Sequence, residues 1–195
     1  MSKLIKITAS VTILLLLGSC VIFKGGNVEK VDFSQLNSTS NQKKKIYVRW
    51  DFDFLPIGHS SLTYEDRERL FEKVLNESNC CELVKKKTEA DLIFEGKAYD
   101  QRNSARLVGF MASVVTAYII PSWHTAKIFV TVDVKDGKNT RHYEAIDSMT
   151  TAIWLPLIVA TPFAYDFDKT QKEILENSYR SLLVQIKNDS FFSKK

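Results

Sequence analysis

The feature that most constrains this fold is a pair of segments on either side of Asp136-Gly137. In residues 126–134, apolar side chains occupy every second position, with mostly polar side chains between them. This period of two predicts a strand with one buried face, running to Asp136. Asp-Gly after such a strand predicts a tight turn into a returning strand over residues 140–149. The chain is therefore expected to build its sheet around an antiparallel hairpin.

Other segments predict further strands. Residues 46–54 alternate apolar and polar side chains, and residues 90–98 do the same, so each predicts a strand with one buried face. A short extended piece is expected near residues 81–84. These strands would extend the sheet beyond the hairpin.

Two amphipathic helices are predicted. Thr63 followed by Asp66 resembles a capping box before an apolar stripe, and Asp168 with Gln171 three residues on is a plausible start for the last helix. The stripe residues are Leu70, Phe71, Val74 and Leu75 in the first helix and Leu175, Tyr179, Leu182 and Ile186 in the second. Each stripe needs an apolar surface to pack against.

These elements predict a single α+β domain over residues 46–195. The expected fold is a mainly antiparallel sheet of four to five strands with two helices packed on one face, in the order β-α-β-β-β-α. Packing both helices on one face of a sheet is the economical way to bury the two stripes.

Two uncharged segments flank the hairpin, at residues 107–123 and 151–165. Neither is expected to span a bilayer as a helix, which takes about 20 consecutive apolar residues. Pro156 and Pro162 interrupt both helical and strand hydrogen bonding in the second segment. Because paired strands of equal length bring their outer ends together, both segments should emerge at the same end of the hairpin and touch.

Three interpretations of these segments remain open. They could cover the far face of the sheet and complete the core, or form an exposed lobe that dips into a membrane or binds a partner. A transmembrane β-hairpin would need alternating polar and apolar residues, and neither segment alternates. The residues expected at an exposed surface are Tyr118, Ile119, Trp123, Trp154, Leu155 and Tyr165.

The amino-terminal 20 residues have the pattern of an export signal. Lys3 and Lys6 precede an apolar stretch at residues 7–17, which is followed by Leu17-Gly18-Ser19-Cys20. Eleven residues rise only about 16 Å as a helix, against a hydrocarbon core of roughly 30 Å. The stretch is therefore interpreted as the core of a signal peptide over residues 1–19.

Leu-x-Ser-Cys after such a core resembles the lipobox of bacterial lipoproteins. In that family the cysteine is diacylated on sulfur, the chain is cut just before it, and the new amine is acylated. The resemblance implies that Cys20 is the lipidated first residue of the mature protein. Val21, where the family's inner-membrane retention signal has Asp, implies the outer membrane, facing the periplasm. Residues 20–45, rich in Ser, Asn and Gln over 34–42, are expected to be a flexible tether.

Cys80 and Cys81 are the two remaining cysteines. Neighbouring Cα atoms lie about 3.8 Å apart, below the usual range for a disulfide, so a bond between them is not expected. Partly buried structural thiols are favoured, with intermolecular pairing or a redox role as alternatives. No Cys-x-x-Cys or spaced Cys/His cluster occurs, so a zinc site is not expected.

Nothing in the sequence predicts catalysis, a metal site or a cofactor. Asp51 and Asp53 share one strand face, but such pairs are usually solvent-facing, and His59, His124 and His142 lack partners at ligand spacing. The formal net charge of +4 includes Lys3 and Lys6 of the signal, so it makes no case for nucleic acid.

Two functions are expected from different classes. The favoured one is a non-enzymatic, lipid-anchored accessory protein of the cell envelope that docks onto an assembly partner or the membrane through its apolar segments. The alternative is a carrier or sensor that shields an apolar ligand, such as a lipid chain. The element order is similar to that of small α/β domains in envelope lipoproteins, including the lipopolysaccharide-assembly and curli-secretion lipoproteins, in order and anchoring alone.

Overall fold

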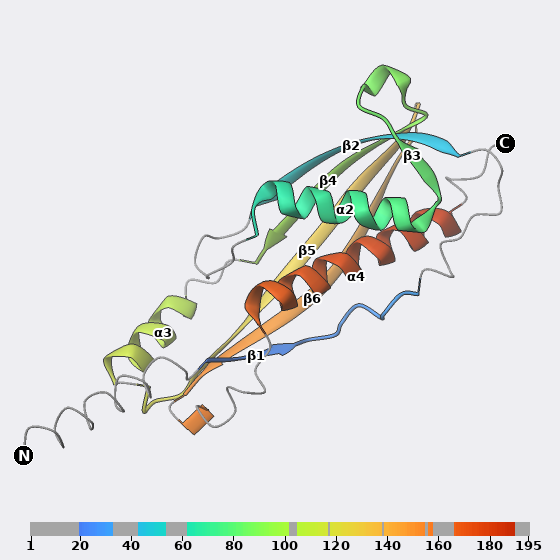
Figure 1. The fold of residues 1–195 in the computed structure, drawn as a ribbon. Coiled ribbons are helices and arrows are strands. Elements are labelled where there is room, and N and C mark those ends of the chain that lie inside the picture. The colour runs from blue at the N-terminus through green and yellow to red at the C-terminus, as the bar shows by residue number, and fades with distance from the viewer. Residues whose placement is uncertain are drawn as a thin grey trace, which may run out of the picture.

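The fold is built on one curled six-stranded sheet (Figure 1). It is seen in a computed structural model that describes residues 20–32, 43–53, 62–101, 105–116, 118–137, 139–154, 156–157 and 166–189. The strands are β1 (Cys20–Lys24), β2 (Lys44–Asp53), β3 (Cys81–Leu83), β4 (Leu92–Asp100), β5 (Ser122–Asp136) and β6 (Asn139–Ile153).

The sheet is mixed, and its strands lie in the order β1-β6-β5-β4-β2-β3. β2 pairs in parallel with both β3 and β4, whereas the pairs β4–β5, β5–β6 and β6–β1 are antiparallel. A parallel pair needs a crossover connection, and the chain between β2 and β4, which contains a helix, provides it.

Three α-helices lie in the described part of the chain: α2 (Tyr64–Ser78), α3 (Ala105–Val115) and α4 (Phe167–Asn188). A short 3-10 helix, η2 (Lys87–Glu89), precedes β4. Figure 1 shows α2 and α4 side by side on one face of the sheet, while α3 lies beyond the far end of the sheet, where β5 begins. The core is therefore between the sheet and α2 with α4.

The capping box predicted for the first helix is confirmed. Thr63 Oγ1 accepts a hydrogen bond from the Asp66 amide at 3.1 Å, and Asp66 Oδ2 accepts one from the Thr63 amide at 3.0 Å. The cap predicted for the last helix is wrong by two residues, because Asp166 rather than Asp168 accepts the hydrogen bond, from the Lys169 amide at 2.8 Å. Both predicted stripes are buried, Leu182 among them.

Aromatic side chains fill the space between the sheet and the helices. The Trp50 ring lies 5.0 Å from that of Phe71 and 5.1 Å from that of Tyr179, measured between centroids. Gly96 is the β4 residue in register with Trp50, and a Cβ placed there would lie 2.4 Å from the indole ring. This glycine lets the indole lie flat across the neighbouring strand.

The predicted fold class is wrong in three respects. The sheet has six strands and mixed pairing, instead of four to five mainly antiparallel strands, and three described helices, not two, follow a different order. β1 and α3 were not expected. β1 has five residues and pairs only with β6, too short a run for an alternation to show. α3 is mostly apolar and lacks the buried apolar stripe that predicted the other two helices.

Residues 20–32, which the sequence assigns to a tether, lie against the domain in the structure. β1 pairs with β6, and Asn27 donates to Asp147 Oδ1 from its amide at 3.0 Å and to Ser148 Oγ from its side chain at 2.8 Å. Asn177 of α4 donates to the carbonyl oxygen of Val28 at 3.0 Å. The sheet therefore begins at Cys20 and not at Ile46.

Candidate functional site

The β5–β6 hairpin brings the two uncharged segments together. Its register runs without interruption from Asp136↔Asn139 at the turn to Ser122↔Ile153 at the opposite end. Both strands are longer than the sequence predicts and extend into the uncharged segments. The expectation that these segments meet is confirmed, because Trp154 Nε1 donates to the carbonyl oxygen of Ile119 at 3.2 Å.

The helix α3 buries its polar side and exposes its apolar side, the reverse of a helix that packs on a globular core. Ser113 is fully buried, while Val108 and Val115 are 72% and 80% exposed. Phe110, Met111 and Val114 are exposed as well. Helices of soluble proteins normally bury the apolar stripe and expose the polar one. The apolar side chains of α3 therefore face outward at this end of the molecule.

Local hydrogen bonds satisfy the polar groups where α3 ends. Ser113 Oγ donates to the carbonyl of Ile120 at 2.9 Å, and Thr116 Oγ1 donates to that of Ala112 at 2.9 Å. The Tyr118 amide donates to the Ser113 carbonyl at 2.7 Å, with Tyr118 at φ 63°. The chain turns back into β5 with these polar groups paired inside the turn.

We call the exposed surface formed here the apolar end. Its side chains are large, apolar and solvent-accessible, and they belong to Val108, Phe110, Met111, Val114, Val115, Ile119, Ile120, Trp123 and Trp154. They come from α3, the turn after it and the outer end of the hairpin. Concentrations of exposed apolar side chains are typical of interaction surfaces.

The residues that the sequence proposed for this surface fall into three groups. Ile119, Trp123 and Trp154 are exposed at the apolar end, and Tyr118 is half-buried in the turn. Leu155 and Tyr165 lie outside the described residues.

Sequence reasoning missed the contribution of α3. One signal was available, because Gly109, Ser113 and Thr116 are small or polar and recur at helical spacing. A Cβ placed on Gly109 would lie 3.5 Å from Ser122 Oγ, so this stripe faces β5. The apolar residues between these positions are the ones that the helix exposes.

Cys20 lies at the same end of the sheet. It is in register with Ile153 of β6, which in turn is in register with Ser122 of β5. Further along, Lys24 Nζ lies 2.7 Å from Glu173 Oε2 of α4, and the Gly25 amide donates to the Ser148 carbonyl at 2.7 Å. The backbone that follows Cys20 is thus held on the domain from β1 onward.

A groove of about 490 Å³ lies beside the segment that follows β1. Charged and polar side chains dominate its lining, which comprises Lys24, Gly26, Val28, Glu29, Lys30, Asp147, Glu173, Glu176, Asn177 and Arg180. Buried Asp147 is engaged there by the amides of Asn27 and Ser148.

The carboxylates and imidazoles considered from the sequence do not assemble into a site. Asp51 and Asp53 lie on the sheet face away from the helices, and no group of three potential metal-ligating side chains occurs among the described residues. His142 Nδ1 and Asp133 Oδ1 lie 2.7 Å apart, exposed on neighbouring strands. His59 is outside the described residues.

Two tyrosines have raised pKa values for structural reasons. Burial, followed by a hydrogen bond to Asp189, raises the pKa of Tyr143 to about 12. Burial between the sheet and α2 raises the pKa of Tyr179 as well. Both phenols stay neutral at physiological pH and help to hold α4 in place.

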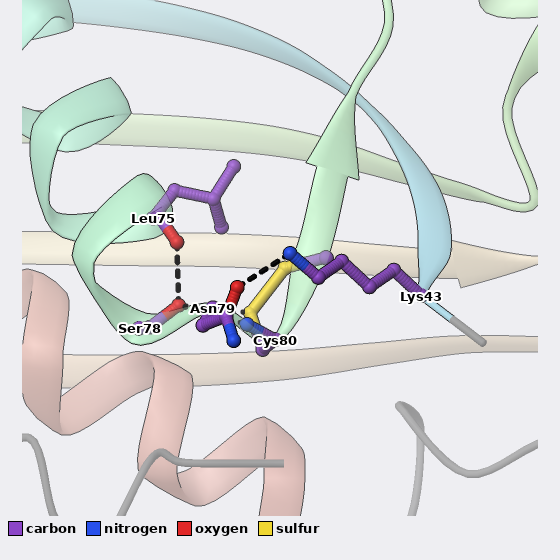
Figure 2. The surroundings of a disulfide bond; sticks show 6 residues. Lys43, Leu75, Ser78, Asn79 and Cys80 are labelled. Carbon is purple, nitrogen blue, oxygen red and sulfur yellow. Dashed lines mark hydrogen bonds between the residues drawn. A yellow bond between two sulfur atoms is a disulfide. The ribbon is translucent and has the colours of Figure 1, made fainter. Parts of the chain in front are cut away.

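Cys80 and Cys81 are joined by a disulfide, contrary to the expectation of separate thiols (Figure 2). Ser78 Oγ donates to the Leu75 carbonyl at 2.6 Å and lies 3.0 Å from Cys80 Sγ. Asn79, at φ 52°, turns the chain from α2 into β3, so both cysteines enter the same buried space. Lys44 of β2 lies 4.0 Å from Asp136 at the hairpin turn, which places this disulfide at the end of the sheet opposite the apolar end.

None of the helices in the described ranges is long and apolar enough to cross a membrane. α3 has 11 residues and is the most apolar of them.

Comparison with known proteins gives no family for this chain. No family model matches it, and no curated protein matches it in sequence. Among solved structures, it is similar to a PelC dodecamer from Paraburkholderia phytofirmans, with 8% identity over 84% of this chain and 98% of the other and a TM-score of 0.37. It is also similar to the hypothetical protein CT253 from Chlamydia trachomatis, with 10% identity over 75% of this chain and 97% of the other and a TM-score of 0.42. Likenesses this distant carry no argument about function.

Proposed function

We propose that this protein is a non-enzymatic, lipid-anchored lipoprotein of the bacterial cell envelope that acts as a docking or accessory subunit at the membrane. Acylated Cys20 attaches it to the membrane, and the apolar end is the surface with which it docks. The resemblance of the first 20 residues to a lipobox signal supports the anchor, and Val21 supports the outer membrane facing the periplasm.

The observation that carries the proposal is the position of the apolar end relative to Cys20. Among the residues that the structure describes, ten of the twelve exposed large hydrophobic side chains belong to β1, α3, the turn after it or the outer end of the hairpin, and β1 starts with Cys20. Exposed apolar side chains that take part in no interaction are normally scattered singly over a protein surface, whereas these are concentrated at one end. Attachment and docking are therefore served by one end of the molecule.

The exposure of the apolar side chains favours docking over carriage of a lipid chain. A carrier needs apolar side chains that enclose a space, whereas those of α3 and of the outer end of the hairpin are open to solvent.

Fractionation of cells that make the Cys20→Ser variant tests the anchor. Two or more acyl chains hold a protein on a membrane stably, at about 0.8 kcal/mol for each buried CH₂. The wild-type protein should sediment with membranes and incorporate labelled palmitate, and the variant should lose the label. A Cys20→Ser protein that still carries the label would contradict the proposal.

A further inference from the structure

We infer that the apolar end enters the lipid bilayer itself, in the leaflet that holds the acyl chains of Cys20, so that the β5–β6 hairpin stands away from the membrane. This inference rests on the proposed function, because acylated Cys20 brings the membrane to this end. The occupant of the surface is a lipid bilayer and not a protein.

Cys20, the proposed site of acylation, lies close to the apolar end. Cys20 is paired with Ile153, and Ile153 with Ser122, so two strand spacings, about 10 Å, separate the backbone of Cys20 from the start of β5. The chain enters β1 directly at Cys20, without a spacer. A bilayer that holds acyl chains on Cys20 is therefore already in contact range of this surface.

Contacts with α4 hold the chain that follows Cys20 in one position on the domain. Lys24 is bound to Glu173, and the Asn177 side chain binds the Val28 and Glu29 carbonyls and the Val31 amide. These contacts hold the segment after β1 along α4 and prevent it from swinging as a tether. The domain then has one orientation relative to a membrane at Cys20, with the apolar end toward it.

The described side chains of α3 suit a lipid environment. Those exposed over residues 108–115 are apolar, and Ser113, Thr116 and Tyr118 pair polar groups of the last turn internally. A lipid environment requires this pairing, because it offers no hydrogen-bond partners to a backbone. With 11 residues, α3 is about 16 Å long and can lie in the interface but cannot cross it.

The two tryptophans at the apolar end have the character of interfacial anchors. Trp123 is 72% exposed, and Trp154 is exposed while its indole N–H is bound to Ile119. Tryptophan is enriched where apolar and wet surroundings meet, because its ring is apolar and its N–H is polar. The two indole rings would therefore lie at the membrane–water interface, which sets how deeply the apolar end enters the bilayer.

With the apolar end in the bilayer, the β5–β6 hairpin would project away from the membrane surface. β5 and β6 have 15 residues each, so the turn at Asp136 and Asn139 would stand about 50 Å from the apolar end. The disulfide of Cys80 and Cys81 lies near that distant end.

Tryptophan fluorescence provides the test. The chain has three tryptophans, and the third, Trp50, packs in the core against Phe71 and Tyr179. The acylated full-length lipoprotein is reconstituted into vesicles of phosphatidylethanolamine and phosphatidylglycerol, with or without brominated acyl chains. Bromine quenches indoles that enter the lipid, so brominated vesicles should remove most of the emission of Trp123 and Trp154.

Two variants make the assignment specific. With Trp123→Phe and Trp154→Phe combined, the remaining emission should be insensitive to bromine, because only Trp50 is left. With Val108→Ser and Val115→Ser combined, all three indoles remain, and quenching should fall because the exposed face of α3 has become polar. Both valines are largely exposed, so the fold should persist, which circular dichroism checks.

The outcomes separate this inference from the proposed function. Protein that sediments with vesicles and is not quenched by bromine would overturn the inference and leave the lipid anchor standing. Unquenched protein with crosslinks from the apolar end to another envelope protein would overturn it in favour of a protein partner. Purified protein that carries no acyl chains and does not sediment with vesicles would contradict the proposed function itself.

Discussion

The indole N–H of Trp154 donates a hydrogen bond to the carbonyl oxygen of Ile119, 35 positions earlier in the chain, at 3.2 Å. This contact joins the residue that follows β6 to the turn that precedes β5. It ties together the two uncharged segments, which the hairpin brings to one end of the sheet. The side chains of the apolar end are nevertheless left facing outward.

Truncation of exposed and buried isoleucines should give different stabilities. Ile119→Ala, at a side chain that is 68% exposed, should leave the melting temperature close to wild type. Ile128→Ala, at a fully buried position of β5, should cost about 2–5 kcal/mol through lost burial and a cavity. Thermal melts of the non-acylated Cys20→Ser chain compare the two. Equal losses of stability in Ile119→Ala and Ile128→Ala would contradict the exposed position of the turn between α3 and β5.

A charge under α4 should unfold the domain. Leu182 is buried against the sheet, and Leu182→Asp places an uncompensated charge there. The cost is several kcal/mol, against a domain stability of about 5–15 kcal/mol. The matched control is Asn188→Asp, at an exposed position near the end of the same helix. A wild-type melting temperature for Leu182→Asp would refute the packing of α4 on the sheet.

The amide of Asn177 should hold the segment after β1 in place. Asn177→Ala removes its hydrogen bonds to the Val28 and Glu29 carbonyls and to the Val31 amide. Leaving these partners unpaired should lower the free energy of local unfolding of this segment by about 1–3 kcal/mol. Hydrogen exchange should accelerate over residues 25–31 and stay unchanged in β5. Unchanged exchange at Val31 would show that the segment is held by other contacts.

The ion pair between Lys24 and Glu173 should make β1 sensitive to acid. The hydrogen bond from Lys24 lowers the pKa of Glu173 from its ordinary value of 4.5. A lowered folded pKa means that the pair stabilises the protein above pH 4.5, and this contribution is lost as the pH falls through the folded pKa.

Both groups are partly solvated, so the contribution is about 0.5 kcal/mol. Glu173→Gln should therefore melt slightly below wild type at neutral pH, and the difference should vanish in acid. Glu82→Gln, on the exposed side of β3, is the control and should show no such change. A difference that grows in acid would contradict the assignment.

Local patterns predicted the elements better than their assembly. The Thr63 and Asp66 box, the Asp136-Gly137 turn and the stripe of α4 depend on neighbours a few residues apart, and each has its structural counterpart. The parallel pairing of β2 with β4 depends on how the chain crosses over between them, which no local pattern encodes.

The candidate site was predicted only in part, for a related reason. Trp123, Ile119 and Trp154 were found because they flank a readable hairpin. The face of α3 was missed, because its helical period is carried by the small and polar residues Gly109, Ser113 and Thr116 that face β5, and not by a buried apolar stripe. β1 was missed because it has only five residues, of which the first four are apolar, so no alternation shows in its sequence. Its position beside β6 is what relates Cys20 to the apolar end.

Intact-mass and peptide analysis of the protein purified from membranes tests the central claim most directly. The account predicts a mature chain that begins at Cys20 and carries a diacylglyceryl group on its sulfur and an acyl group on its amine. The amino-terminal peptide should release fatty acids on hydrolysis. A membrane-purified chain that retains residues 1–19, or that begins at an unmodified Cys20, would contradict the account.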